Sequence, residues 1–174
     1  MVDWEAMAAL GGDLLWQDVD AVDVARVIRD GGGYGYMASA YTKRFDKLGG
    51  KPLLGHDVPV RDAFMWRAWF AAHHAPLYSP LETEHALATM KNERPSFTGL
   101  DGRLQGLSGG YQDFHFDAVD AATWDILNDP FVLAAECVVV PPIHGRDHSV
   151  GTEREIRTAL KAQIPVYVLA DMSR

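Results

Sequence analysis

Length, composition and charge already exclude several classes of protein. The chain has 174 residues, of which 48% are hydrophobic and 23% charged, a balance typical of one ordinary globular domain over 1–174. Its 16 basic and 24 acidic residues give a net charge of −8, which disfavours long nucleic acids as partners because their binding needs clustered cations. The single cysteine excludes an internal disulfide and zinc sites built on several thiolates.

The apolar runs of the sequence are too short to cross a bilayer. The longest, such as 131–135 and 137–142, fall far below the roughly 20 residues of a spanning helix. The N-terminus carries Asp3 and Glu5 and lacks the basic start and apolar core of a secretory signal. We therefore expect a cytoplasmic protein without a membrane partner.

Helical and extended patterns alternate along the first half of the chain. Residues 3–29 have the spacing of one or two helices, so we expect a helical N-terminal extension over 1–30. The apolar run at 34–39 predicts a strand, 42–58 a connection, and the aromatic repeat at 59–74 a helix.

The second half continues this alternation. The segment 76–80 predicts a short strand, and 92–113, rich in Gly, Ser and Pro, predicts a long surface loop. The other expected elements are a short helix at 82–90, a helix at 116–135 with a break or new first turn at Pro130, a strand at 137–140, a helix at 151–163 and a strand at 165–169.

Strands that alternate with helices favour an α/β fold, in which a parallel sheet is covered by helices on both faces. Ligands of such sheets bind beyond the carboxyl ends of the strands, near the point where the strand order reverses. We therefore expect the ligand near the segments that follow 37–39 and 137–140.

The stretch 138–155 carries the strongest functional signal. Ser149 or Thr152 can cap the helix that begins there, which leaves backbone N–H groups for a phosphate or carboxylate. Glu155 follows in or near the first turn, and an ionised carboxylate beside a sugar C1′ can act as nucleophile or stabilise an oxocarbenium ion. The spacing Thr152-x-x-Glu155 is also that of a capping box, in which Glu155 would only bond the backbone N–H of Thr152.

Other reactive residue types have ordinary structural explanations. His144-x-x-x-His148 has the spacing of a metal pair, but it lies in an expected loop and no acidic residue completes a ligand set, so we expect no metal. Cys137 falls inside a buried strand, where a small hydrophobe is the usual explanation. The glycine run at 31–35 precedes a strand instead of following one, so it predicts no dinucleotide cofactor.

Several short segments carry motifs in a recognisable order and spacing, foremost the stretch 36–42 and Gly145-x-x-x-Ser149-x-Gly151-x-x-x-Glu155. These two resemble the opening Tyr-Leu-Ala-Ser-Pro-Tyr-Ser and the Gly-Trp-x-x-Ser-x-Gly-x-x-x-Glu signature of the nucleoside 2-deoxyribosyltransferase-like and nucleoside 5′-monophosphate N-glycosidase family. The weaker similarities are 77–80 with 84–88, Trp124 with Asn128, 136–140 and 164–166.

The resemblance implies a three-layer flavodoxin-like (Rossmann-like) fold with a mainly parallel five-stranded sheet. It implies cleavage or transfer of the N-glycosidic bond of a (deoxy)nucleoside or nucleoside 5′-monophosphate, with Glu155 as nucleophile, no cofactor, and a homodimer or higher homo-oligomer. The family's acid falls on Asn128, so Asn128 or its neighbour Asp129 would contact the base or its leaving nitrogen. The expected substrate-binding residues are Tyr36, Ser39, Tyr41, Arg44, His85, Ser149 and Gly151.

Two other hypotheses remain open at this point. The asparagine at position 128 allows a catalytically inactive nucleotide-binding or sensor module on the same fold. His144 and His148 allow a metal-dependent hydrolase.

Overall fold

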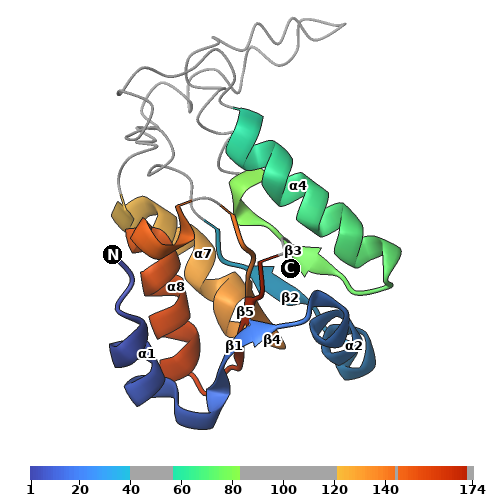
Figure 1. The fold of residues 1–174 in the computed structure, drawn as a ribbon. Helices are drawn as coiled ribbons and strands as arrows, with labels where there is room; N and C mark the ends of the chain where they lie inside the picture. The colour runs from blue at the N-terminus through green and yellow to red at the C-terminus, as the bar shows by residue number, and fades with distance from the viewer. Residues whose placement is uncertain (40–56, 83–120, 144, 172–174) are drawn as a thin grey trace, which may run out of the picture.

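A parallel five-stranded sheet forms the middle layer of the protein (Figure 1). The computed structural model describes residues 1–39, 57–82, 121–143 and 145–171. The strands lie in the order β1-β5-β4-β2-β3, with bounds β1 Leu15–Val19, β2 Gly35–Met37, β3 Leu77–Tyr78, β4 Cys137–Val140 and β5 Val166–Leu169. This architecture confirms the expected three-layer flavodoxin-like α/β fold.

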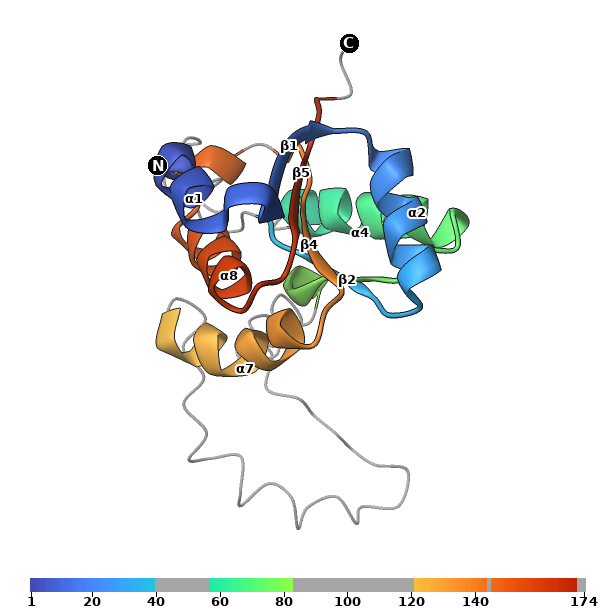
Figure 2. The same ribbon diagram turned by 90° about the horizontal axis from the view of Figure 1, so that it is seen from below.

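Helices cover both faces of the sheet (Figure 2). The chain passes from β1 to β2 and on to β3 in one direction across the sheet, then returns through β4 to β5. Because crossovers between parallel strands are right-handed, the two directions place their helices on opposite faces. One face carries α2 (Ala21–Gly31) and α4 (Asp57–Ala72), and the other carries α1 (Trp4–Gly11), α7 (Ala121–Leu133) and α8 (Val150–Lys161).

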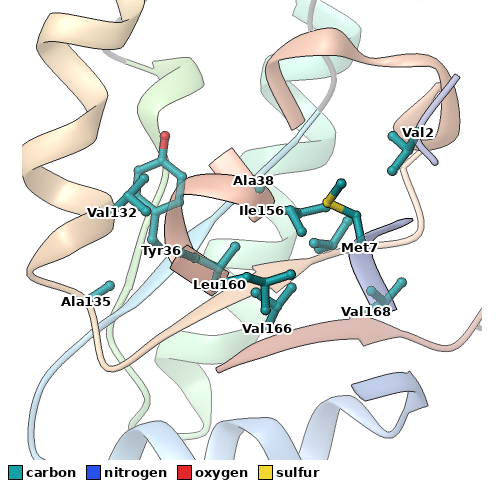
Figure 3. Packing of buried hydrophobic residues seen from close by; sticks show 13 residues of the cluster. Val2, Met7, Tyr36, Ala38, Val132, Ala135, Ile156, Leu160, Val166 and Val168 are labelled. Atoms are coloured by element: carbon teal, nitrogen blue, oxygen red, sulfur yellow. The ribbon is translucent and has the colours of Figure 1, made fainter. Parts of the chain in front are cut away.

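Two apolar clusters hold the three layers together. Alternate side chains of a strand point to opposite faces, so Tyr36 and Ala38 join the cluster under α8 while Met37 joins the one under α4. Figure 3 shows the first cluster, in which Tyr36, Val132 of α7 and Ile156 of α8 are buried. The central strand β4 is buried on both faces, which explains its continuous apolar run.

The prediction that residues 3–29 form only helices is wrong, because β1 lies between α1 and α2. Leu15 pairs with Val166 and Val19 with Leu169, so β1 is the edge strand beside β5. Its three central residues are exposed, and a bulge interrupts its register. A sequence pattern cannot reveal such a strand, since it has no alternation of buried and exposed positions. The first 30 residues thus contribute a strand to the sheet.

Most other predicted elements are confirmed within the described residues. The strand at 137–140 and the helices at 59–74 and 151–163 match β4, α4 and α8 closely. Pro130 neither breaks the helix around it nor starts a new one, because α7 continues through it and Ala134 N–H donates to the Pro130 carbonyl at 3.2 Å. The predicted loop at 92–113, and most of the predicted connection at 42–58 and helix at 82–90, lie outside the described residues.

Within the described parts of the chain, none of the helices has the length and apolar character needed to cross a bilayer.

Gly35 allows β2 to pack closely between α2 and β3. A Cβ at this position would lie 2.6 Å from Ile28 Cδ1 and 2.9 Å from Leu77 Cδ1, which is too close for either atom. We expect Gly35→Ala to lower the free energy of unfolding by about 1–3 kcal/mol, the usual cost of overpacking a core. Urea denaturation measures this change. Gly31→Ala is the control, since its Cβ would meet only the end of the Glu136 side chain at 3.4 Å; equal losses in both variants would contradict the packing argument.

Candidate functional site

The topology places the candidate site at the carboxyl ends of β2 and β4. The chain leaves β2 toward β3 on one side and leaves β4 toward β5 on the other, so the strand order reverses between these two neighbours. Ala38 N–H donates to the Val139 carbonyl at 2.9 Å, which keeps the two strands together up to this edge. A crevice outside this reversal point is where open α/β sheets bind ligands. Ser39 follows β2 there, and the turn that leads into α8 follows β4.

One buried hydrogen bond joins β2 to α8 in this region. The Tyr36 hydroxyl donates to Glu155 Oε1 at 2.6 Å, and the two residues are 0% and 6% exposed. Figure 3 shows the Tyr36 ring beside Val132, with its hydroxyl directed away from the apolar cluster. A buried carboxylate is costly unless polar groups compensate it, so this bond both stabilises and orients the Glu155 side chain.

The capping-box interpretation of Glu155 is wrong. The N-cap of α8 is Ser149, whose Oγ accepts the Thr152 N–H at 3.2 Å. Because α8 begins at Val150, Glu155 lies in its second turn and not at the third helical position, where a capping glutamate stands. The carboxylate bonds Tyr36 on the sheet, so the role of Glu155 is not to cap its own helix.

The start of α8 presents several hydrogen-bonding groups near Glu155. The N–H groups of Val150 and Gly151 begin the helix and have no intrahelical acceptor, and the helix dipole adds partial positive charge. Ser149 is buried, and its hydroxyl oxygen accepts the Thr152 N–H. The hydroxyl proton can still be donated to another group. Together these groups can bind an anionic or hydroxyl-bearing end of a small molecule.

Buried hydroxyls without a partner in the described part of the chain lie at the same edge. Ser39 Oγ follows β2, Ser79 Oγ follows β3, and Thr152 Oγ1 lies one turn before Glu155 on α8. Such atoms are rare because each costs about 1–3 kcal/mol when buried unpaired. Ser39 was among the expected binding residues, whereas Ser79 and Thr152 were missed. Their positions, directly after a strand and three residues before Glu155, were the available signals.

Asn128 and Asp129 of α7 have different surroundings. Asn128 is 4% exposed, whereas Asp129 accepts a hydrogen bond at 3.2 Å from Arg154, which also pairs with Asp125. Arg154 precedes Glu155 in α8, so this ion cluster ties α7 to the catalytic candidate's own helix. The structure therefore gives Asp129 a basic partner, and it buries the amide of Asn128 instead of a carboxylate.

Some predicted site residues cannot be placed. Tyr41, Arg44, His85 and His144 lie outside the described residues. Gly151 is exposed at the second position of α8, beside Ser149.

Metal binding and thiol chemistry depend on the arrangement of the described His, Cys, Asp and Glu side chains. The described His, Cys, Asp and Glu side chains form no group of three that could hold a metal ion. Cys137 is buried in β4, and burial together with the nearby Glu136 carboxylate raises the pKa of its thiol to about 12. A thiol with such a pKa is protonated at neutral pH, so Cys137 is not an activated nucleophile.

Comparisons with known proteins add one partial match. Residues 111–171 match the model of a family described as a domain of unknown function, DUF1937. The matched stretch contains α7 and α8, and therefore both Asn128 and Glu155. Comparison with curated proteins and with solved structures gave no match.

Removing the Tyr36 hydroxyl tests how much the bond to Glu155 contributes. We expect Tyr36→Phe to lower the free energy of unfolding by about 1–3 kcal/mol, because Glu155 stays buried with one donor fewer. Equilibrium denaturation at neutral pH measures the change. Tyr167→Phe makes the same substitution on β5 and serves as the control. Wild-type stability in Tyr36→Phe would contradict a stabilising role for this bond.

Proposed function

We propose that the protein cleaves or transfers the N-glycosidic bond of a (deoxy)nucleoside or nucleoside 5′-monophosphate, with Glu155 as nucleophile. The Tyr36–Glu155 hydrogen bond is the observation that carries this proposal. The two residues come from the opening strand and the helix of the sequence resemblance, 119 positions apart, and they meet near the reversal of strand order, where open α/β sheets bind ligands. This contact supports the proposal, because it orients the carboxylate that the resemblance assigns as nucleophile.

Cleavage of an N-glycosidic bond by this route requires a carboxylate held in one orientation beside the sugar. A Glu155 oxygen forms a bond to C1′ while the bond from C1′ to the base nitrogen breaks, and the base leaves with that electron pair and takes up a proton from water. Water then attacks C1′ and releases Glu155 in a hydrolase, whereas a second base does so in a transferase. Tyr36 contributes by fixing the carboxylate, which reduces the loss of freedom needed to reach the reactive geometry.

The rest of the substrate has candidate partners around Glu155. The first N–H groups of α8 and the Ser149 hydroxyl suit a 5′-hydroxyl or 5′-phosphate. Ser39 at the end of β2 suits the sugar, and Asn128 suits the base because an amide both donates and accepts. Tyr41, Arg44 and His85 remain proposed substrate contacts on the basis of the resemblance alone.

A second candidate function is a nucleotide-binding or sensor module that does not catalyse. The observation that favours it is the buried Asn128 amide, which cannot protonate a leaving base. The neighbouring carboxylate of Asp129 forms an ion pair with Arg154. Both functions share the same binding site, so turnover distinguishes them.

Replacing the Glu155 carboxylate by an amide tests catalysis directly. We expect Glu155→Gln to reduce the release of free base from a panel of nucleosides and 5′-monophosphates by at least about a thousandfold, since a neutral amide is a poor nucleophile. The amide oxygen of the substituted side chain can still accept the Tyr36 hydrogen bond, so stability should change little. Glu153→Gln is the matched control, because Glu153 pairs with Arg157 on the same helix.

Calorimetry on the same panel completes the experiment. Binding by the wild type without any release of base would favour the non-catalytic module. Neither binding nor turnover would refute both functions, and a wild-type rate in Glu155→Gln would refute the nucleophile assignment.

We also propose that the protein acts in the cytoplasm as a homodimer or higher homo-oligomer. Support comes from the apolar side chains that α7 exposes, among them Ile126 at 77% and Leu133 at 54%. Sedimentation velocity should show an oligomer in the wild type and dissociation in Ile126→Lys, while Val22→Lys, at another exposed apolar position on α2, should leave it intact. A monomeric wild type would contradict the proposal.

A further inference from the structure

The N-terminal segment of the chain holds the turn that precedes α8. Val2 N–H donates to the carbonyl oxygen of Asp147 at 2.6 Å. The indole N–H of Trp4 donates to Asp147 Oδ1 at 3.0 Å. The backbone bond comes from the buried Val2, and the more exposed indole bond adds a side-chain contact at the same residue.

Asp147 stands where a small displacement would move the N-cap of α8. It is the middle residue of the 3₁₀ turn Arg146–His148, which leads directly into Ser149. Ser149 N–H donates back to the Arg146 carbonyl at 3.4 Å, a long hydrogen bond. Because 3₁₀ turns have poor internal hydrogen bonds, contacts from outside decide how firmly this turn is held.

The same N-terminal segment continues along α8. Met7 is buried in the cluster that contains Ile156 and Leu160 (Figure 3). Further along α1, a Cβ at Gly11 would lie only 2.7 Å from Leu160 Cδ2, so the helices are in close contact there. Contacts therefore run from the turn before α8 to its last turn.

The sheet holds the other side of the turn. The guanidinium of Arg146 donates to the Leu169 carbonyl at the end of β5 at 3.0 Å, and Arg146 Nε lies 3.6 Å from Asp147 Oδ1. The Asp147 carboxylate thus lies between the Trp4 indole and the Arg146 guanidinium. These contacts connect the N-terminal segment, the turn and the carboxyl end of β5.

We infer that Trp4 and Asp147 are positioning residues, through which the N-terminal segment fixes Ser149 and the first N–H groups of α8 for substrate binding. This inference rests on the proposed function for its ligand, the 5′ end of a nucleotide. The segment lies outside the part of the chain that carries the family resemblance, so it is a feature of this chain's own residues. Loosening the turn lowers the affinity of the site without touching Glu155.

Amide hydrogen exchange tests the positioning without any ligand. Trp4→Phe keeps most of the ring and removes the donor to Asp147. We expect the Thr152 and Glu153 amides, which bond the side chain and backbone of Ser149, to exchange about tenfold faster. Leu160 and Lys161 at the far end of α8 should exchange as in the wild type. Trp16→Phe, at an exposed position of β1, is the control.

Two aspartate variants separate the hydrogen bond from the fold. Asp147→Asn keeps an acceptor for the Trp4 indole and should retain most of the protection, whereas Asp147→Ala should match Trp4→Phe. Unchanged exchange at Thr152 and Glu153 in both Trp4→Phe and Asp147→Ala would overturn the inference. Equal acceleration along the whole of α8 would also overturn it, because that result reports only a general loss of stability.

Ligand measurements complete the test with nucleoside 5′-monophosphates as probes. We expect Trp4→Phe to raise the KM by about tenfold while kcat stays within about twofold, since Glu155 is untouched. An unchanged KM beside faster exchange would overturn the link to binding. If the wild type neither binds nor turns over any probe, the proposed function fails, while the exchange data still decide whether Trp4 and Asp147 position Ser149.

Discussion

The hydrogen bond between Tyr36 and Glu155 is the constraint on which the candidate site depends. It requires a tyrosine in the interior strand β2 and a glutamate in the second turn of the helix that follows the neighbouring strand β4. Both residues are buried, so loss of either leaves the polar group of the other with one partner fewer away from water. The bond therefore couples the position of α8 to the sheet, and the helix start, Ser149 and the ion cluster of Arg154 are placed relative to it.

The strand order explains why this coupling occurs where it does. Counted from the β3 edge, the strands lie in the order β3-β2-β4-β5-β1. The first four follow the flavodoxin-like pattern, in which the chain first moves to one edge and then back across the sheet, and β1 takes the last position. The order reverses between β2 and β4, the strands that lead to Ser39 and to the turn before α8. Polar groups gather at the carboxyl edge because side chains and helix ends, instead of further strand pairing, must satisfy the backbone there.

Much of the fold could be predicted from the sequence, which also singled out Glu155 of the candidate site. The apolar run of β4 and the periodicity of α8 are local signals, and the spacing between Ser149 and Glu155 marked the glutamate that the structure buries against Tyr36. β1 could not be predicted, because its exposed residues carry no periodic pattern and only pairing with β5 makes it a strand. Likewise, the contact of Glu155 with Tyr36 and that of Asp129 with Arg154 depend on tertiary packing, which spacing along the chain does not encode.

The pairing of β1 with β5 has a consequence for how the protein is made. Leu15 lies opposite Val166, so β1 has no neighbouring strand until β5 has been synthesised. Until then both edges of β1 are unpaired, and contacts so distant in sequence form slowly. The segment that contacts the turn before α8 is thus translated before its partners in α8 and β5, which makes completion of the candidate site a late event in folding.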